Sequence, residues 1–235
     1  MKVLLATLTY ASTIENNEVI AGNYLNVGNF VTTFTDNNIK VDIIEINVKG
    51  LSKALNIGLN YCILNGYDGV CFMANDIVEP KDWLMKRIES SIKYEHNAII
   101  AIPVNERVIV DYNCNIIGNY YIPKKIIESV GYFTDSFGVY GAIDLDYCQR
   151  ARVKGFQTLY LGGIDAKHLT INSDTKYGFS KKEQVDKTWD MHVKDVQEYC
   201  QGKGQLYQEP PEYIINMQQY FNESGNRIRD IENDL

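Results

Sequence analysis

Three stretches of the chain carry side chains that could bind a divalent cation or move a proton. Asp76 ends the stretch FMAND, Asp144 and Asp146 lie in YGAIDLDYCQR, and His168 follows FQTLYLGG. Hard cations prefer oxygen ligands such as carboxylates, and Mn²⁺ also accepts imidazole. A carboxylate at the start of a helix can also act as a general base. These residue types point to metal binding or acid–base chemistry, provided that the fold brings them together.

Taken singly, each stretch also has a purely structural interpretation. Asp76 could be a turn residue or a helix cap, since aspartate is favoured at both. Asp144 and Asp146 could cap the helix that follows, and Asp146 has the i,i+4 spacing of an ion pair with Arg150. A single histidine after a strand, such as His168, is more often structural than a ligand. The positions of the surrounding elements therefore decide between the two interpretations.

Hydrophobic periodicity predicts the elements that would position these side chains. Short apolar runs predict strands at 2–10, 40–48, 68–73, 97–104 and 156–163. Apolar stripes at helical spacing predict helices at 19–34, 51–66, 81–93, 144–155, 180–200 and 212–221. This alternation predicts an α/β fold with a mostly parallel central sheet, whereas residues 103–140 look less regular. Ligands of such sheets bind at the carboxyl ends of the strands, and Asp76 follows the third strand.

Composition narrows the class of protein. The chain has 235 residues, of which 45% are hydrophobic, enough for one sizeable domain with a real core. Its net charge of −7 argues against a nucleic-acid partner, which usually leaves a basic footprint. Five scattered cysteines without a Cys-x-x-Cys pair indicate reduced thiols rather than a zinc site. With no long apolar run, we expect no transmembrane segment and a cytoplasmic location.

Two nucleotide-binding signatures are missing from the sequence. The turn after the first strand is TYASTIENN, which contains neither Gly-x-Gly-x-x-Gly nor a P-loop. This argues against a Rossmann dehydrogenase and against a P-loop nucleotide hydrolase. The glycine-rich loop of a sugar-nucleotide pyrophosphorylase is absent from the same turn.

The sequence resembles the GT-A glycosyltransferases, above all the family 2-like group. The resemblance rests on three features in this order: a strand-end carboxylate, a paired carboxylate that opens a helix, and a strand-end histidine. ANDIVEPKDWL resembles the family's Asn-Asn-Asp metal motif with its following Val-x-Pro-x-Trp-Leu. GAIDLDYCQRARVKG resembles the family's Gly-Glu-Asp-x-Asp-x-x-x-Arg-x-x-x-x-Gly. SKALNIGL and IPKKIIESVGYFTDSF resemble two further family segments. The resemblance implies a GT-A catalytic domain at 1–172, followed by a helical C-terminal extension at 173–235.

The resemblance also implies roles for individual residues. It implies a nucleotide-sugar donor, a UDP-sugar first, and a divalent cation, Mn²⁺ or Mg²⁺, held by Asp76 and His168. It implies that Asp144 is the general base for a hydroxyl acceptor, and a base opposite the leaving group predicts inversion at the anomeric carbon. Glu45 or Asn47 would contact the edge of the base. The other nucleotide-sugar contacts that it implies are Thr9, Tyr10, Lys53, Asn56 and Asn75.

Four positions depart from the family's pattern. Ala74 replaces the first carboxylate of the metal motif, and Ile143 replaces the glutamate before the base. Leu55 stands where an arginine is frequent, so that Lys53 would contact the diphosphate instead, and Ala11 replaces an asparagine. These departures leave open an alternative function: a non-catalytic protein on the same fold that binds a nucleotide sugar or a glycan.

The resemblance implies a glycan or another hydroxyl compound as the acceptor. Because aromatic rings stack well on sugar faces, Tyr120, Tyr121 and Tyr140 are the predicted acceptor contacts. A transferase acting on modified nucleic acid is a third hypothesis, which the acidic charge disfavours. The C-terminal helices could cover the acceptor cleft, form a homo-oligomer or dock a partner.

Overall fold

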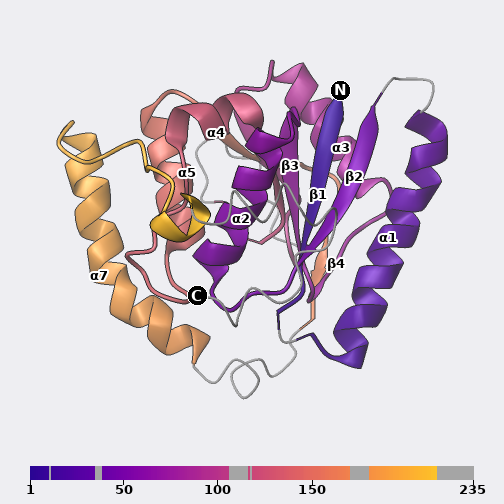
Figure 1. Ribbon diagram of the computed structural model, residues 1–235, viewed down its shortest axis with the longest axis horizontal. Coiled ribbons are helices and arrows are strands. Elements are labelled where there is room, and N and C mark those ends of the chain that lie inside the picture. The colour runs from indigo at the N-terminus through magenta and orange to yellow at the C-terminus, as the bar shows by residue number, and fades with distance from the viewer. Residues whose placement is uncertain (11, 35–38, 106–115, 117, 170–179, 216–235) are drawn as a thin grey trace.

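The computed structural model describes residues 1–10, 12–34, 39–105, 116, 118–169 and 180–215. Its centre is a sheet flanked by helices (Figure 1), with six strands in the order β2-β1-β3-β6-β5-β7. In that order the strands are Lys40–Ile46, Lys2–Leu8, Gly69–Ala74, Tyr120–Pro123, Ala98–Ala101 and Gln157–Tyr160. Neighbouring strands are parallel except at β6, which is antiparallel to both β3 and β5. The expected α/β fold with a mostly parallel sheet is confirmed.

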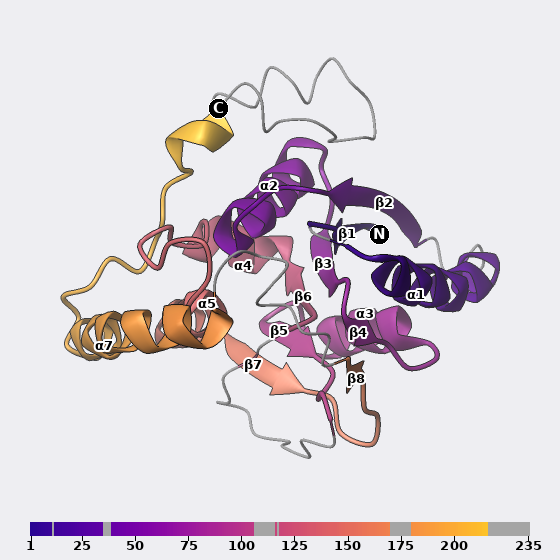
Figure 2. The same ribbon diagram turned by 90° about the horizontal axis from the view of Figure 1, so that it is seen from below.

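Helices cover both faces of this sheet. Figure 2 shows α1 and α3 on one face, α2, α4 and α5 on the other, and α7 beyond α5. Their bounds are Ile14–Phe34 (α1), Leu51–Leu64 (α2), Trp83–Lys93 (α3), Lys124–Val130 (α4), Ile143–Val153 (α5) and Lys181–Cys200 (α7). Val3 and Leu5 of β1 pack in the cluster under α1 and α3, whereas Leu4 and Ala6 pack under α2. Successive side chains of a strand face opposite sides, so this continuous apolar run fills both cores.

The main difference from the sequence prediction lies between residues 103 and 140. Tyr120–Pro123 form β6, and α4 begins directly after Pro123. A four-residue strand next to polar and aromatic residues gives no period that a window of sequence can reveal. The prediction of an irregular segment was therefore wrong for this part of it.

The first helix also begins earlier than predicted, at Ile14 rather than at Val19. The added turn is polar and has no apolar stripe, but it is capped. The Thr13 hydroxyl donates to Asn16 Oδ1 at 2.7 Å, and the Asn16 N–H donates to Thr13 Oγ1 at 3.3 Å. This reciprocal pair satisfies groups that a helix start leaves unpaired.

A small second sheet lies at the end of β3. It consists of β4 (Ile77–Val78) and β8 (Lys167–His168), which pair in antiparallel fashion with Ile77 opposite His168. This pairing places two distant segments of the chain side by side. Because β4 begins one residue after Asp76, the pairing also brings His168 close to Asp76.

A buried ion pair fixes α5 against its surroundings. Asp146 Oδ2 accepts from Arg150 Nε at 2.8 Å, and both side chains are almost completely buried. Arg150 also donates to the backbone carbonyls of Val130 and Tyr132, both at 2.9 Å. The second Asp146 oxygen accepts from the Tyr199 hydroxyl of α7 at 2.7 Å. This network ties α4, α5 and α7 together.

The segment after α7 packs on the same body. Gln208 N–H donates to Val130 O, and Tyr132 N–H donates to Gln208 O. Residues 212–215 are helical, and the rest of the predicted helix 212–221 lies outside the described residues. The division of the chain at residue 172 stays a prediction. Among the described helices, none is long and apolar enough to cross a bilayer.

We expect the Asp146→Ala substitution to lower the free energy of unfolding by about 3–5 kcal/mol, because it leaves the Arg150 guanidinium buried without its carboxylate. Urea unfolding monitored by circular dichroism measures the difference. Asp186→Ala is the matched control, since Asp186 forms an exposed i,i+4 pair with Lys182 on α7. It should leave the unfolding midpoint unchanged. Equal effects of the two substitutions would contradict the role of the buried pair.

Candidate active site

A cavity of about 490 Å³ opens at the carboxyl ends of β1, β2 and β3. One wall is apolar and includes Leu8 from β1, Ile46 from β2 and Phe72 from β3. The opposite wall comes from the segment that leads into α5, and Val185 of α7 also lines the cavity. Such a position is the usual ligand site of a mostly parallel sheet.

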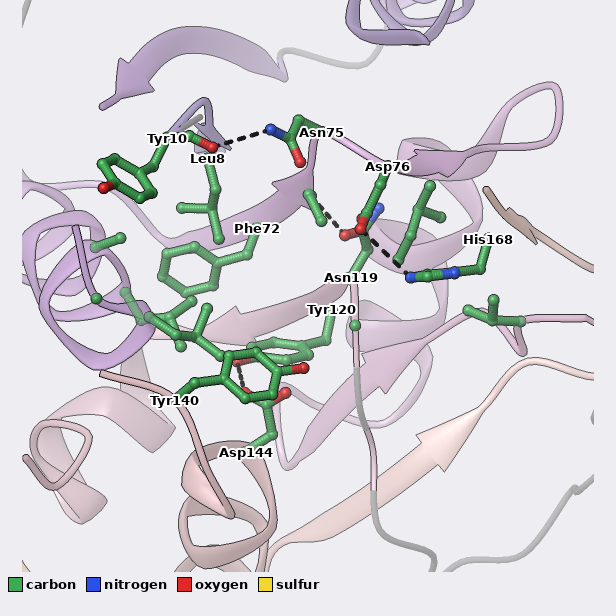
Figure 3. A pocket seen from close by; sticks show the side chains of 18 of the residues that line it. Leu8, Tyr10, Phe72, Asn75, Asp76, Asn119, Tyr120, Tyr140, Asp144 and His168 are labelled. Atoms are coloured by element: carbon green, nitrogen blue, oxygen red, sulfur yellow. Dashed lines mark hydrogen bonds and ion pairs between the residues drawn. The ribbon is translucent and has the colours of Figure 1, made fainter. Parts of the chain in front are cut away.

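Asp76 and His168 meet at one side of this cavity. The β4–β8 pairing brings His168 Nε2 to 3.4 Å from Asp76 Oδ2 (Figure 3). Backbone contacts hold both residues in place: Leu169 N–H donates to Asp76 O at 2.8 Å, and His168 N–H donates to Asn105 Oδ1 at 3.0 Å. Asp76 is mostly buried, whereas His168 remains partly open to solvent. The structure thus brings together the two residues predicted to hold a metal.

Asparagines support the turn that carries Asp76. Asn75 is nearly buried and donates to Ser12 Oγ at 2.8 Å and to Tyr10 O at 3.3 Å. Its own carbonyl accepts from Asn16 Nδ2 at 2.9 Å. These bonds tie the end of β3 to the loop after β1. Asn75 therefore lines the cavity as predicted for a nucleotide contact, but its amide N–H groups already bind the protein.

Asp144 lies at the other side of the cavity, in the first turn of α5. Its Oδ1 accepts from the Tyr120 hydroxyl at 2.7 Å (Figure 3), and its carboxylate also accepts from the Gly118 backbone. Burial raises the pKa of Asp144 to about 6, and the two hydrogen bonds oppose that rise only in part. No charged donor contributes to this balance. A carboxylate with a pKa near neutrality suits a general base.

The three tyrosines predicted as acceptor contacts separate in the structure. Tyr120 and Tyr140 line the cavity, but Tyr121 does not. Neighbouring side chains of β6 face opposite sides of the sheet, so Tyr121 is fully buried in the cluster under α1 and α3. Tyr120 is itself nearly buried against Phe72, with its hydroxyl on Asp144. Tyr140 is thus the tyrosine of the three that offers more open ring surface to a ligand.

The predicted nucleotide contacts are also not all at the cavity. Tyr10 and Asn75 line it, whereas Thr9, Glu45, Asn47, Lys53 and Asn56 do not. Asn56 is fully buried: its amide oxygen accepts from Phe133 N–H at 2.7 Å, and its Nδ2 donates to Phe133 O at 3.0 Å. The Lys53 ammonium lies 5.4 Å from the ring of Tyr213. Nucleotide binding by these residues stays a prediction.

A buried polar group that the sequence did not reveal lies beneath the site. Asn119 lines the cavity and is almost completely buried. Its Nδ2 donates to Glu79 Oε1 at 2.7 Å, and Arg87 donates to the same oxygen at 2.9 Å. Glu79 and Arg87 are separated by a proline and a turn, so their pairing follows no helical or strand spacing. Asn119 belongs to the segment that we predicted to be irregular, and no pattern there singled it out.

The carboxylate of Asp76 and the imidazole of His168 fit a divalent cation whose other ligands come from a bound molecule. One carboxylate and one imidazole suit Mn²⁺ in particular. The described part of the chain contains no cluster of three or more His, Cys, Asp or Glu side chains that could hold a metal. The remaining ligands of a six-coordinate ion would therefore come from a bound anion and from water.

No known protein-family profile matches the sequence. The curated proteins include no match either. Among solved structures, the chain is similar to the mannosyltransferase PcManGT from Pyrobaculum calidifontis, in complex with GDP-Man and Mn²⁺. The two chains share 12% identity with a TM-score of 0.54, over 94% of this chain and 70% of that chain.

GalNAc-T7 with UDP, GalNAc and Mn²⁺ is similar at 8% identity and a TM-score of 0.56, over 83% of this chain and 48% of its own. Residues 1–349 of S. aureus TarS, in complex with UDP-GlcNAc, match at 15% identity and a TM-score of 0.48. That match covers 73% of this chain, which spans only 59% of the TarS chain. The likeness to PcManGT and GalNAc-T7 shows the fold: the chain has the GT-A fold, as the sequence predicted.

The raised pKa of Asp144 predicts a pH-dependent gain in stability for Asp144→Asn. Because the folded-state pKa of about 6 exceeds the usual value of 3.8, ionisation of Asp144 opposes folding. The wild type should therefore lose stability relative to the variant as pH rises from about 4 to about 6. From pH 4 to the range above pH 6, the difference in unfolding free energy should shift in favour of Asp144→Asn by up to about 3 kcal/mol, at 1.36 kcal/mol per pKa unit.

Urea unfolding of both proteins at pH 4 to 8 measures this difference. Asp186→Asn, at an exposed carboxylate of α7, is the control and should show no comparable pH dependence. A stability difference between the variant and the wild type that stays constant from pH 4 to pH 8 would contradict the inferred pKa.

Proposed function

We propose that the protein is an inverting glycosyltransferase that moves a sugar from a nucleoside-diphosphate sugar, a UDP-sugar first, to a hydroxyl acceptor. The observation that carries the proposal is the arrangement of one cavity on a GT-A fold. Asp76 and His168 lie at one side of this cavity, and Asp144 lies at the other (Figure 3). PcManGT and GalNAc-T7, the two neighbours with the higher TM-scores, were each solved with a nucleotide and Mn²⁺.

In this proposal Asp76 and His168 hold a divalent cation, Mn²⁺ or Mg²⁺, together with the diphosphate of the donor. When bound, the cation offsets the charge that develops on the diphosphate as its bond to the sugar breaks. Tyr10, Leu8, Ile46 and Phe72 line the cavity and would pack against the nucleoside.

Asp144 is the proposed general base. It takes the proton of the acceptor hydroxyl while the acceptor oxygen forms a bond to the anomeric carbon and the nucleoside diphosphate leaves. The hydrogen bonds from Tyr120 and Gly118 hold the carboxylate toward the cavity. Because the base and the leaving group lie on opposite sides of the sugar, the configuration at the anomeric carbon inverts. Tyr140 is the proposed stacking surface for an acceptor sugar.

Two departures from the family pattern support a second candidate, a nucleotide-sugar or glycan-binding protein without turnover. Ile143, at the place of a glutamate, is fully buried and contributes packing. Ala74, at the place of a metal-binding carboxylate, has no side-chain oxygen to offer, and its backbone N–H donates to Asn119 Oδ1 at 2.6 Å. Turnover separates the two candidates. A nucleic-acid acceptor stays the least favoured alternative.

Metal-dependent nucleotide binding tests the donor site. We expect UDP to bind the wild type in the presence of Mn²⁺ and at least tenfold more weakly without it, since the cation links the diphosphate to Asp76. Asp76→Ala should weaken binding to the same extent, and Asp186→Ala should not change it. Calorimetric titration of UDP, with and without Mn²⁺, measures all three proteins. Binding that needs no metal and survives Asp76→Ala would overturn the metal site.

Turnover tests the base. With a donor sugar that the wild type transfers or hydrolyses, Asp144→Asn should lower kcat by about 10²–10⁴-fold, the usual contribution of a general base. UDP affinity should not fall, because the substitution removes a negative charge from the cavity. The wild-type rate should rise with pH through about 6, where Asp144 loses its proton. The anomeric configuration of the product, read by NMR, should be inverted. Nucleotide binding without any turnover would favour the binding protein.

A further inference from the structure

We propose that Asn119 is a positioning residue that couples the two sides of the cavity, holding the turn of Asp76 with its side chain and the base Asp144 through the adjoining backbone. Its coupling of the two sides is a property of the fold, whereas its effect on catalysis rests on the proposed function. Figure 3 shows Asn119 and Tyr120 between Asp76 and Asp144.

On the side of Asp76, the Asn119 amide uses both of its ends. Its Oδ1 accepts from the N–H of Ala74, the last residue of β3, at 2.6 Å. Its Nδ2 donates to Glu79 Oε1 at 2.7 Å. Ala74 and Glu79 flank the segment formed by the turn at Asn75 and Asp76 and by β4. One side chain therefore bridges the two ends of this segment.

The partner of this amide is itself held firmly. Glu79 is buried, its N–H donates to Asn23 Oδ1 at 3.0 Å, and its carboxylate accepts from Arg87 at 2.9 Å. Arg87 also donates to the backbone carbonyl of Asn119 at 3.3 Å. Because these groups are almost completely buried, a lost partner is not replaced by bulk water, and the arrangement has little freedom to relax.

On the side of Asp144, both neighbours of Asn119 in the chain contact the base. Gly118 contributes a backbone hydrogen bond to the carboxylate, and Tyr120 donates its hydroxyl to Oδ1 at 2.7 Å. Gly118 has a φ of +86°, and a Cβ there would lie 3.1 Å from Ile77 Cδ1. The backbone at Gly118 thus has a conformation that glycine favours, and the adjoining Asn119 side chain anchors it to Ala74 and Glu79.

Position 119 requires the side-chain amide of an asparagine. The site needs an acceptor for the Ala74 N–H and a donor for the Glu79 carboxylate, from one side chain of this length. Alanine provides neither. Aspartate keeps the acceptor but places a second carboxylate 2.7 Å from Glu79 Oε1, so that it fits only when the pair shares a proton.

Two NMR signals and the affinity for UDP test the coupling in the full chain. The protein has three histidines, so labelled histidine gives three ring signals, of which His168 reports on the side of Asp76. The carboxyl signal of Asp144 reports its pKa. In Asn119→Ala we expect the His168 signal to move and the pKa of Asp144 to rise by about half a unit or more, as its hydrogen bonds weaken. The affinity for UDP with Mn²⁺ should fall by about tenfold.

Asn60→Ala is the matched control. Asn60 is also a nearly buried asparagine, it accepts from the Tyr132 hydroxyl at 3.0 Å, and it does not line the cavity. The Asn60→Ala substitution should lower the melting temperature, because it removes a buried hydrogen bond. Both NMR signals and the UDP affinity should stay as in the wild type. If Asn119→Ala is too unstable to measure, Asn119→Asp replaces it. Its perturbations should grow with rising pH, as the shared proton is lost.

Signals of His168 and Asp144 that stay in place in both Asn119 variants would overturn the proposal, and so would a response on one side of the cavity alone. A wild type that does not bind UDP with Mn²⁺ would count against the proposed function. The NMR signals would still decide whether Asn119 couples the two sides.

Discussion

The direction of β6 is the constraint on which the site depends. A strand that runs against its neighbours begins at the sheet edge where they end. Because β6 is antiparallel to β3 and β5, Tyr120 and the residues before it lie at the carboxyl edge, beside the turn of Asp76. A parallel strand would have placed the same residues at the far edge of the sheet. The contacts of Asn119 with Ala74 and of Tyr120 with Asp144 both require this direction.

The two aspartates of α5 have different surroundings because the helix points their side chains in different directions. Residues two apart point to nearly opposite sides of a helix, because each residue turns the chain by about 100°. Asp146 therefore points into the core, where Arg150 and Tyr199 bind its two oxygens. Asp144 points to the cavity, where its donors are a phenol and a backbone N–H, both neutral. Burial without a cationic partner raises the pKa of Asp144, whereas Asp146 has the buried Arg150 guanidinium beside it.

Periodic elements could be predicted from the sequence, and contacts that depend on the position of β6 could not. The apolar runs of β1, β2, β3, β5 and β7 and the stripes of α1, α2, α3, α5 and α7 predicted the mostly parallel sheet and its flanking helices. Asp76 follows a strand end and Asp144 opens a helix, so their place at one edge could be expected. His168 reaches this edge through the two-residue strand β8, which gives no periodic signal. Tyr121 and Asn119 could not be assigned, because their surroundings follow from a four-residue strand without a periodic signal. Asn56 matched a family motif, yet its amide holds the backbone of Phe133.

The charge of the cavity limits how a nucleotide sugar could bind. Among the described residues that line it, there are two carboxylates and one imidazole, and neither lysine nor arginine. A nucleoside diphosphate adds at least two negative charges to a site that already holds Asp76 and Asp144. In a poorly solvated cavity such charges repel strongly unless a cation lies between them. On the proposed function, with Ala74 at the place of a carboxylate, Asp76 and His168 alone would hold a cation weakly. On the proposed function, the cation and the diphosphate therefore bind together, each completing the site for the other.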